Sequence, residues 1–285
     1  MTFKKIRFVT DSTCDLPQNL LDQHNIRVVP CYINHGENSY PDDGKALSRE
    51  DFYRQLPAMR PSPTTAAPSP GDTKAAIEAA FAEADHVIVM TVAAKLSGTL
   101  NAMRLGAADL PPDRVTLLDS ESVTMGLGWP VLIGAETAAA TGSVEETLAV
   151  MERVKQNTHV YAALETLEFL RRSGRVGWAA AGIGALLQIK PILHVFGGEV
   201  HQAGRVRTFT RAVDELIRFC QTHAPIDRLA ILHATNLQGA MDLQNRLADL
   251  APSDTIIVSI TPTIGTHIGP GGLGLVPVSK SWRTG

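Results

Sequence analysis

Two polar segments of the chain carry side chains that suit the binding of an anion. Ser97, Gly98 and Thr99 stand between an apolar strand pattern and a helical pattern, where hydroxyl groups and the free N–H groups of a helix start can meet a ligand. Asp11 and Ser12 follow the first strand pattern at an equivalent place, the carboxyl end at which open α/β sheets bind ligands. For each of these residues, capping of the following helix is an equally good explanation.

A third segment, GTHIGPGGLG at 265–274, places His267 among glycines and is expected to form a loop after a strand. Gly269 and Gly271 allow positive φ and a close approach of the backbone, so successive N–H groups can face an anion. The competing explanation is that His267 only bonds local backbone. GPGGLG also matches the dinucleotide pattern GxGxxG, but only 11 residues follow Gly274, too few for the βαβ unit that such a site needs.

Signatures of catalysis and of metal binding are absent. The chain has no GxSxG, HExxH or GxxxxGK[ST] segment, and its three cysteines form no CxxC pair, so neither a cofactor nor a metal is expected. Ser97 and His267 still leave open a hydrolase or acyl transferase that acts on a lipid-like substrate with a serine–histidine pair. No third residue that would orient the histidine is identifiable, so binding is favoured over catalysis.

The composition excludes several classes of protein. Hydrophobic residues make up 44% of the 285 residues, enough to exclude a disordered chain. The net charge of −3 gives no basic field for nucleic acid. No run of about 18 apolar residues occurs, so no integral membrane segment is expected. Free cysteines and the lack of a signal-peptide pattern predict a cytoplasmic location.

The order of the elements predicts an α/β protein with two domains. Strand patterns over 4–10, 26–35, 86–93 and 114–120 alternate with helical patterns, which is typical of a parallel sheet covered on both faces. Ser48 and Ser143 are expected to cap two of the helices. From about residue 158 the strands and helices are grouped instead, and the last strand is expected over 255–263. We therefore predict an N-terminal Rossmann-like α/β domain over 1–157 and a C-terminal α+β domain over 158–285.

Two further segments admit two explanations each. Residues 60–72 contain four prolines and are expected to lack regular structure, either as a linker or as a rigid loop that lines a site; helical patterns on both sides favour the loop. The segment LRRSGRV contributes Arg171, Arg172 and Arg175, which are either solvated surface charges or a face for an acidic partner.

Taken together, the segments VTDSTCDLP (9–17), the proline-rich loop with its threonine, SGT (97–99), LEFLRRSGRV (167–176) with KPIL (190–193), and GTHIGPGGLG resemble the DegV family, in the same order and over nearly the whole chain. The resemblance implies a two-domain DegV-like fold that binds a long-chain fatty acid in a tunnel between the domains. It places the fatty-acid carboxylate on Thr65, Ser97 and His267. The residues singled out above at the strand ends and among the glycines are expected to support this site: Asp11, Ser12, Gly98, Thr99, Gly269 and Gly271.

The resemblance further implies that the protein is not itself an enzyme. It would present the carboxylate to a fatty-acid kinase, whose acyl phosphate product feeds phospholipid synthesis. The arginine cluster gives a separate hypothesis, in which Arg171, Arg172 and Arg175 dock that kinase. One departure lies beside the proposed head group: the family commonly has T-S-Q-P-S where this chain has Thr65-Ala66-Ala67-Pro68-Ser69, so a hydroxyl and an amide are lost. The expected apolar walls of the tunnel are 179–193 and the helix after Gly126.

Overall fold

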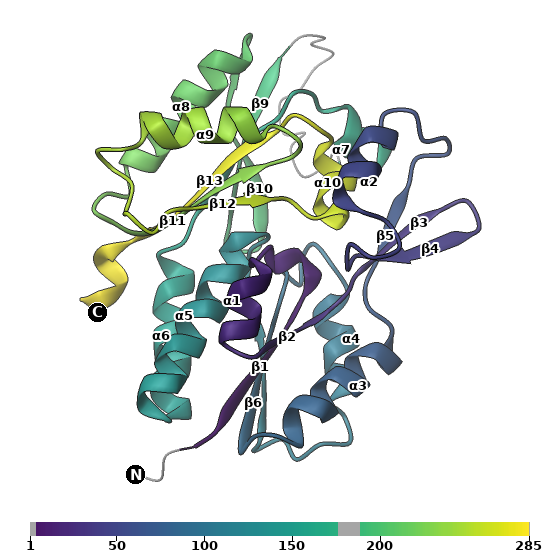
Figure 1. Ribbon diagram of the computed structural model, residues 1–285, viewed down its shortest axis with the longest axis vertical. Coiled ribbons are helices and arrows are strands. Elements are labelled where there is room, and N and C mark those ends of the chain that lie inside the picture. Colours follow the sequence, from purple (N-terminus) through teal and green to yellow (C-terminus); the bar gives the residue numbers. More distant parts are fainter. Residues whose placement is uncertain (1–3, 176–188, 285) are drawn as a thin grey trace.

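The computed structural model describes residues 4–175 and 189–284, which form three sheets and the helices that cover them (Figure 1). The first sheet is parallel, with the strand order β2-β1-β6-β7. Its strands are β1 (Ile6–Asp11), β2 (Ile26–Val29), β6 (His86–Thr91) and β7 (Val115–Asp119). Every side chain of β6 is buried, which agrees with the prediction of a parallel sheet covered on both faces.

Helices pack on both faces of the parallel sheet because successive side chains of each strand point to opposite sides. Phe8 and Ile88 face α5 (Met125–Thr141) and α6 (Val144–Gln156), whereas Val9 and Val89 face α3 (Pro70–Phe81) and α4 (Thr99–Gly106). The helices of this region are α1 (Gln18–Gln23), α2 (Arg49–Gln55), α3 (Pro70–Phe81), α4 (Thr99–Gly106), α5 (Met125–Thr141) and α6 (Val144–Gln156).

A second sheet of six strands follows, in the order β10-β9-β8-β13-β11-β12, with β11 and β12 parallel and the other neighbours antiparallel. Its strands are β8 (Val160–Ala163), β9 (Lys190–Phe196), β10 (Glu199–Val206), β11 (Ile226–His233), β12 (Ile256–Ser259) and β13 (Leu273–Ser279). The described helices after residue 157 are α7 (Glu168–Arg172), α8 (Phe209–Gln221), α9 (Leu237–Arg246) and α10 (Pro262–Ile268). The predicted class, a parallel α/β region followed by an α+β region, is confirmed.

The third sheet is small and antiparallel, with the order β4-β3-β5, and it corrects two expectations. The strand predicted over 26–35 is two strands, β2 and β3 (Tyr32–His35), because Pro30 cannot donate to a ladder and the chain changes sheets there. The proline-rich loop is not wholly irregular, since Thr64–Ala66 forms β5 and pairs with β3. The remaining strand of this sheet is β4 (Asn38–Pro41).

The hydrophobic core runs without a break from the parallel sheet to the six-stranded sheet. Helix α5 is buried on nearly all sides between them, and its Trp129 indole donates a hydrogen bond of 3.1 Å to the carbonyl of Val276 in β13. Asn157 is the C-cap of α6, just before β8. The division into domains at residue 157 stays a prediction.

Candidate functional site

A cavity of about 180 Å³ brings together side chains from distant parts of the chain. It lies where the proline-rich segment, the segment after β6 and helix α10 meet. Its lining residues come from both sides of residue 157: Thr13, Cys31, Thr65, Ala66, Ala67, Val92, Leu96, Ser97, Gly98, Val123, Arg175, Thr263, Ile264 and His267. All three residues that were predicted to bind a carboxylate are among them.

Thr65 and His267 are in direct contact, with 3.2 Å between Thr65 Oγ1 and His267 Nε2. Strand β5 fixes Thr65, which lies opposite Ile33 of β3. His267 does not lie in a glycine loop, as the sequence analysis expected, but in the last turn of α10. This helix starts with an extended Thr261 and with Pro262 at its first position, where proline is well suited because the N–H is not needed.

Ser97 approaches the same cavity from the segment that follows β6. Its Oγ is 2.8 Å from Thr99 Oγ1 and accepts a hydrogen bond of 3.3 Å from the Thr99 backbone N–H. The N-cap of α4 is Gly98 rather than Ser97. Within the described part of the chain, Ser97 is hydrogen-bonded to Thr99 and not to His267.

The electrostatics of the cavity suit an anion. None of its described lining residues is acidic, and Arg175 contributes a positive charge. Burial and, to a smaller extent, the charge of Arg175 lower the pKa of His267 to about 4. The imidazole is therefore neutral at pH 7 in the ligand-free protein, and a bound carboxylate would accept a hydrogen bond from a neutral ring rather than from imidazolium.

The supporting residues predicted at 11 and 12 stand behind the cavity rather than in its wall. The Asp11 carboxylate accepts hydrogen bonds from the backbone N–H of Thr13 at 2.9 Å and of Val92 at 2.8 Å, two residues that do line the cavity. Ser12 bonds to Asp42 and faces a separate cleft. Asp11 thus ties together the ends of β1 and β6.

Of the other predicted supporting residues, Gly98 and Thr99 lie at the cavity, whereas Gly269 and Gly271 lie outside its described lining. Gly98 lines the cavity, and Thr99 is buried next to it. Gly269 (φ 76°) and Gly271 (φ 84°) hold the chain where it leaves α10, and the Gly271 N–H donates a hydrogen bond of 2.6 Å to the carbonyl of Ala234. The expected positive φ angles are confirmed, but these two glycines shape the exit of the helix and are absent from the described lining.

The three arginines predicted to dock a partner have different environments. Arg171 is exposed on α7. Arg172 is half-buried and donates hydrogen bonds to Ser62 Oγ at 2.8 Å and to the carbonyl of Met59 at 2.9 Å, so it fastens α7 to the proline-rich segment. Arg175 lines the cavity and bonds to the carbonyl of Ser173. Arg171 is the member of this set that faces outward.

The apolar wall of the cavity was not predicted from the sequence; it includes Leu96, Val123 and Ile264. A signal for Ile264 existed: it precedes His267 by three residues, the spacing of one helix face. Most of the wall predicted at 179–193 lies outside the described residues. The other predicted wall, the helix after Gly126, is α5, which belongs to the core and contributes nothing to the described lining.

Over 4–175 and 189–284, no helix combines the length and apolar character that crossing a membrane requires. The same residues contain no group of three or more His, Cys, Asp or Glu side chains placed to hold a metal ion.

Comparisons with known proteins agree on one family. Residues 5–280 match the family described as "Uncharacterised protein, DegV family". A DegV domain-containing protein of Streptomyces coelicolor is 34% identical over 285 residues, covering 97% of this chain and 99% of that protein.

Solved structures are similar over the same extent. A DegV family protein from Thermus thermophilus, described for its fatty acid binding, has a TM-score of 0.88 and 33% identity, covering 96% of this chain and 99% of that one. The Bacillus subtilis DegV, described as a fatty acid binding protein, has a TM-score of 0.84 and 27% identity, covering 97% and 100%. From the match over nearly its whole length, this chain belongs to the DegV family.

Proposed function

We propose that this protein binds a long-chain fatty acid without chemically changing it, with the carboxylate held by Thr65, Ser97 and His267. The observation that carries the proposal is the meeting of these three side chains in one cavity whose described lining has no acidic residue. Two hydroxyls and one imidazole N–H supply donors for carboxylate oxygens. Arg175 adds a favourable charge, and Leu96, Val123 and Ile264 offer apolar surface to the first carbons of the tail.

The similar proteins described as fatty acid binding support the ligand class. The cavity's position, with lining residues before and after residue 157, supports a tunnel between the two proposed domains. Ala66 and Ala67 line the cavity in place of the hydroxyl and amide that the family commonly has. The head group would therefore meet fewer donors from the proline-rich segment, which increases the share carried by Ser97 and His267.

Native mass spectrometry tests the ligand class directly. The protein, purified from bacterial cells, is expected to carry a mass increment of a long-chain fatty acid, and the delipidated protein is expected to take up one equivalent of oleate. Methyl oleate is the matched control, because it keeps the tail and removes the carboxylate charge. Delipidated protein that stays free of every long-chain acid offered, or that takes up the ester equally well, would contradict the proposal.

We further propose that the bound carboxylate is presented to a fatty-acid kinase, with Arg171 in the docking surface. Arg171 is exposed at the end of α7, three residues before a glycine and close in sequence to Arg175 in the cavity wall. An outward guanidinium on this helix suits acidic groups of a partner.

Reversal of charge at Arg171 is expected to weaken kinase binding while leaving fatty-acid content unchanged. Arg171→Glu replaces attraction of an acidic partner by repulsion, an effect that typically appears in the association rate and in the salt dependence. Surface plasmon resonance against the kinase encoded in the same organism would measure it. Arg218→Glu on α8 is the control, since that arginine is exposed on a helix outside the described lining. Equal loss in both variants, or none in either, would refute docking through Arg171.

A further inference from the structure

The first turn of α10, the helix that carries His267, is held by two carboxyl groups from the N-terminal part of the chain. Asp15 Oδ1 accepts a hydrogen bond of 2.9 Å from the N–H of Thr261. Asp42 Oδ2 accepts one of 3.1 Å from the N–H of Thr263. The first N–H groups of a helix have no acceptor within the helix. Here the acceptors come from residues more than 200 positions away in the sequence.

Helix α10 depends on these outside contacts because it has little means of holding its own position. It is seven residues long, less than the length at which a helix is stable by itself. The side chain of its N-cap, Thr261, makes no capping hydrogen bond. The carboxyl groups of Asp15 and Asp42 therefore take the place of a local cap.

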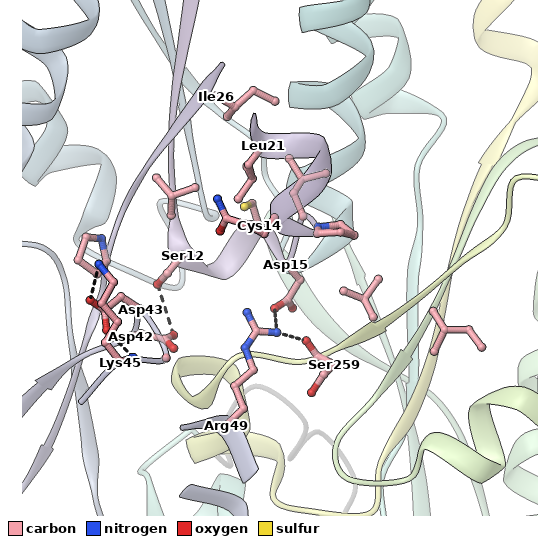
Figure 2. A pocket seen from close by; sticks show the side chains of 18 residues that line it. Ser12, Cys14, Asp15, Leu21, Ile26, Asp42, Asp43, Lys45, Arg49 and Ser259 are labelled. Atoms are coloured by element: carbon pink, nitrogen blue, oxygen red, sulfur yellow. Dashed lines mark hydrogen bonds and ion pairs between the residues drawn. The ribbon is translucent and has the colours of Figure 1, made fainter. Parts of the chain in front are cut away.

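Further side chains from the N-terminal part of the chain bond to the residues just before α10 and to the two carboxyl groups. Arg49 donates to the carbonyl of Ser259 and lies 3.8 Å from Asp15, as the dashed lines in Figure 2 show. Tyr53 Oη donates to the carbonyl of Ile260 at 3.1 Å, and Ser12 Oγ donates to Asp42 at 3.3 Å. Of these residues, Ser12, Asp15, Asp42, Arg49 and Ser259 line a cleft of about 620 Å³ that is separate from the cavity of His267.

Both carboxyl groups are buried, and removing a carboxyl group from water costs free energy. Asp15 is 2% exposed and Asp42 is 7% exposed. Burial raises the pKa of Asp15 to about 8 against the opposing effect of Arg49, and burial also raises the pKa of Asp42. Buried carboxyl groups need hydrogen-bond partners, and a buried polar network that finds them rigidifies one arrangement of the chain.

We propose that Asp42, assisted by Asp15, is a positioning residue that holds α10 so that His267 meets Thr65 and the ligand carboxylate. Thr263 and His267 are four residues apart and line the same cavity, so a shift of the first turn moves the imidazole. The functional meaning of this role rests on the proposed fatty-acid site. The position of His267 itself can be measured without any ligand.

The test is an NMR titration of His267 in delipidated protein, with its signal assigned by its loss in His267→Gln. In the wild type, buried His267 is expected to titrate with a pKa of about 4. Asp42→Ala removes the acceptor of the Thr263 N–H, so α10 loosens, water reaches the ring, and the pKa rises toward its ordinary 6.5. Asp42→Asn, which keeps the size and one acceptor oxygen, is expected to give a smaller rise in the same direction.

The control is Asp227→Ala, which removes a carboxylate that accepts from Trp282 and Arg283, away from α10. It is expected to lower stability while leaving the His267 titration unchanged. If Asp42→Ala fails to fold, the pKa of His267 in Asp42→Asn tests the inference instead. A His267 pKa equal to that of the wild type in every folded Asp42 variant would overturn the inference.

A second arm separates this inference from the proposed function. If the wild-type protein binds oleate, Asp42→Ala is expected to weaken the affinity for oleate about tenfold relative to the wild type, while Asp227→Ala leaves that affinity unchanged. Oleate binding that survives a raised His267 pKa would overturn the link between α10 and the ligand. Wild-type protein that binds no fatty acid would instead refute the proposed function, and the titration would still decide whether Asp42 positions His267.

Discussion

Alanine at His267, Ser97 or Thr65 is expected to weaken fatty-acid binding about ten- to hundredfold for each substitution, because each removes one hydrogen bond to a charged carboxylate, worth about 1.5–3 kcal/mol. The three groups meet in a single cavity, and His267 Nε2 already lies 3.2 Å from Thr65 Oγ1. The loss at His267 is expected to be the largest, since its ring is buried.

Displacement of a fluorescent fatty acid by oleate measures these affinities, and two variants sharpen the interpretation. Thr65→Val keeps the shape of the side chain and removes only the hydroxyl, so it should lose as much affinity as Thr65→Ala. Ser143→Ala, which removes the cap of α6 at Glu146, is expected to lower stability without changing affinity. Unchanged affinity in all three site variants would mean that the carboxylate binds elsewhere.

Gly269→Ala is expected to lower the free energy of unfolding by about 2–5 kcal/mol, the sum of backbone strain and overpacking. Gly269 has φ 76° and ψ −179°, a region that glycine alone adopts readily. A Cβ built there would lie 2.1 Å from Cδ2 of Phe169, a buried ring of α7. Because this residue ends α10, the substitution is also expected to displace His267.

Urea unfolding of Gly269→Ala beside Gly197→Ala separates the two causes. Gly197 also has positive φ (61°), but nothing lies within 4 Å of its Cβ position. Alanine at Gly197 therefore meets strain without a clash and is expected to cost about 1–2 kcal/mol. Equal losses in the two variants would show that the clash with Phe169 adds nothing to the cost of alanine at Gly269.

Local patterns predicted much of this fold from the sequence. The apolar run at 86–93 could only be a strand buried on both faces, and Ser48 and Ser143 do cap α2 and α6. The positions of Ser97 and Asp11 at strand ends followed from the alternation of strands and helices, because parallel strands end at one edge of their sheet.

The C-terminal segment shows why other parts could not be predicted. Glycines at 265–274 outweighed the helix signal of Thr261-Pro262, so α10 was predicted as a loop. The strand predicted last, at 255–263, is followed by β13, which lies between β8 and β11 although it comes later in the sequence than both. Its place depends on pairing with strands far away in the sequence, and no local pattern encodes that pairing.

Arg175 and Asp42 illustrate the same limit for the site. Arg175 looked like a surface charge beside Arg171 and Arg172, yet it lines the cavity of His267. Asp42 stands in a polar segment that predicts a turn, and its contact with Thr263 spans 221 positions. A sequence pattern reports the preference of a segment, whereas these two roles arise only when distant segments pack together.

A crystal structure of the protein with oleate would show where the carboxylate binds. We expect carboxylate oxygens within about 3.2 Å of Ser97 Oγ and His267 Nε2, with Thr65 Oγ1 beside them and the first carbons against Ile264. A carboxylate bound elsewhere, for example beside Arg49 in the cleft of Figure 2, with the cavity of His267 unchanged, would contradict it.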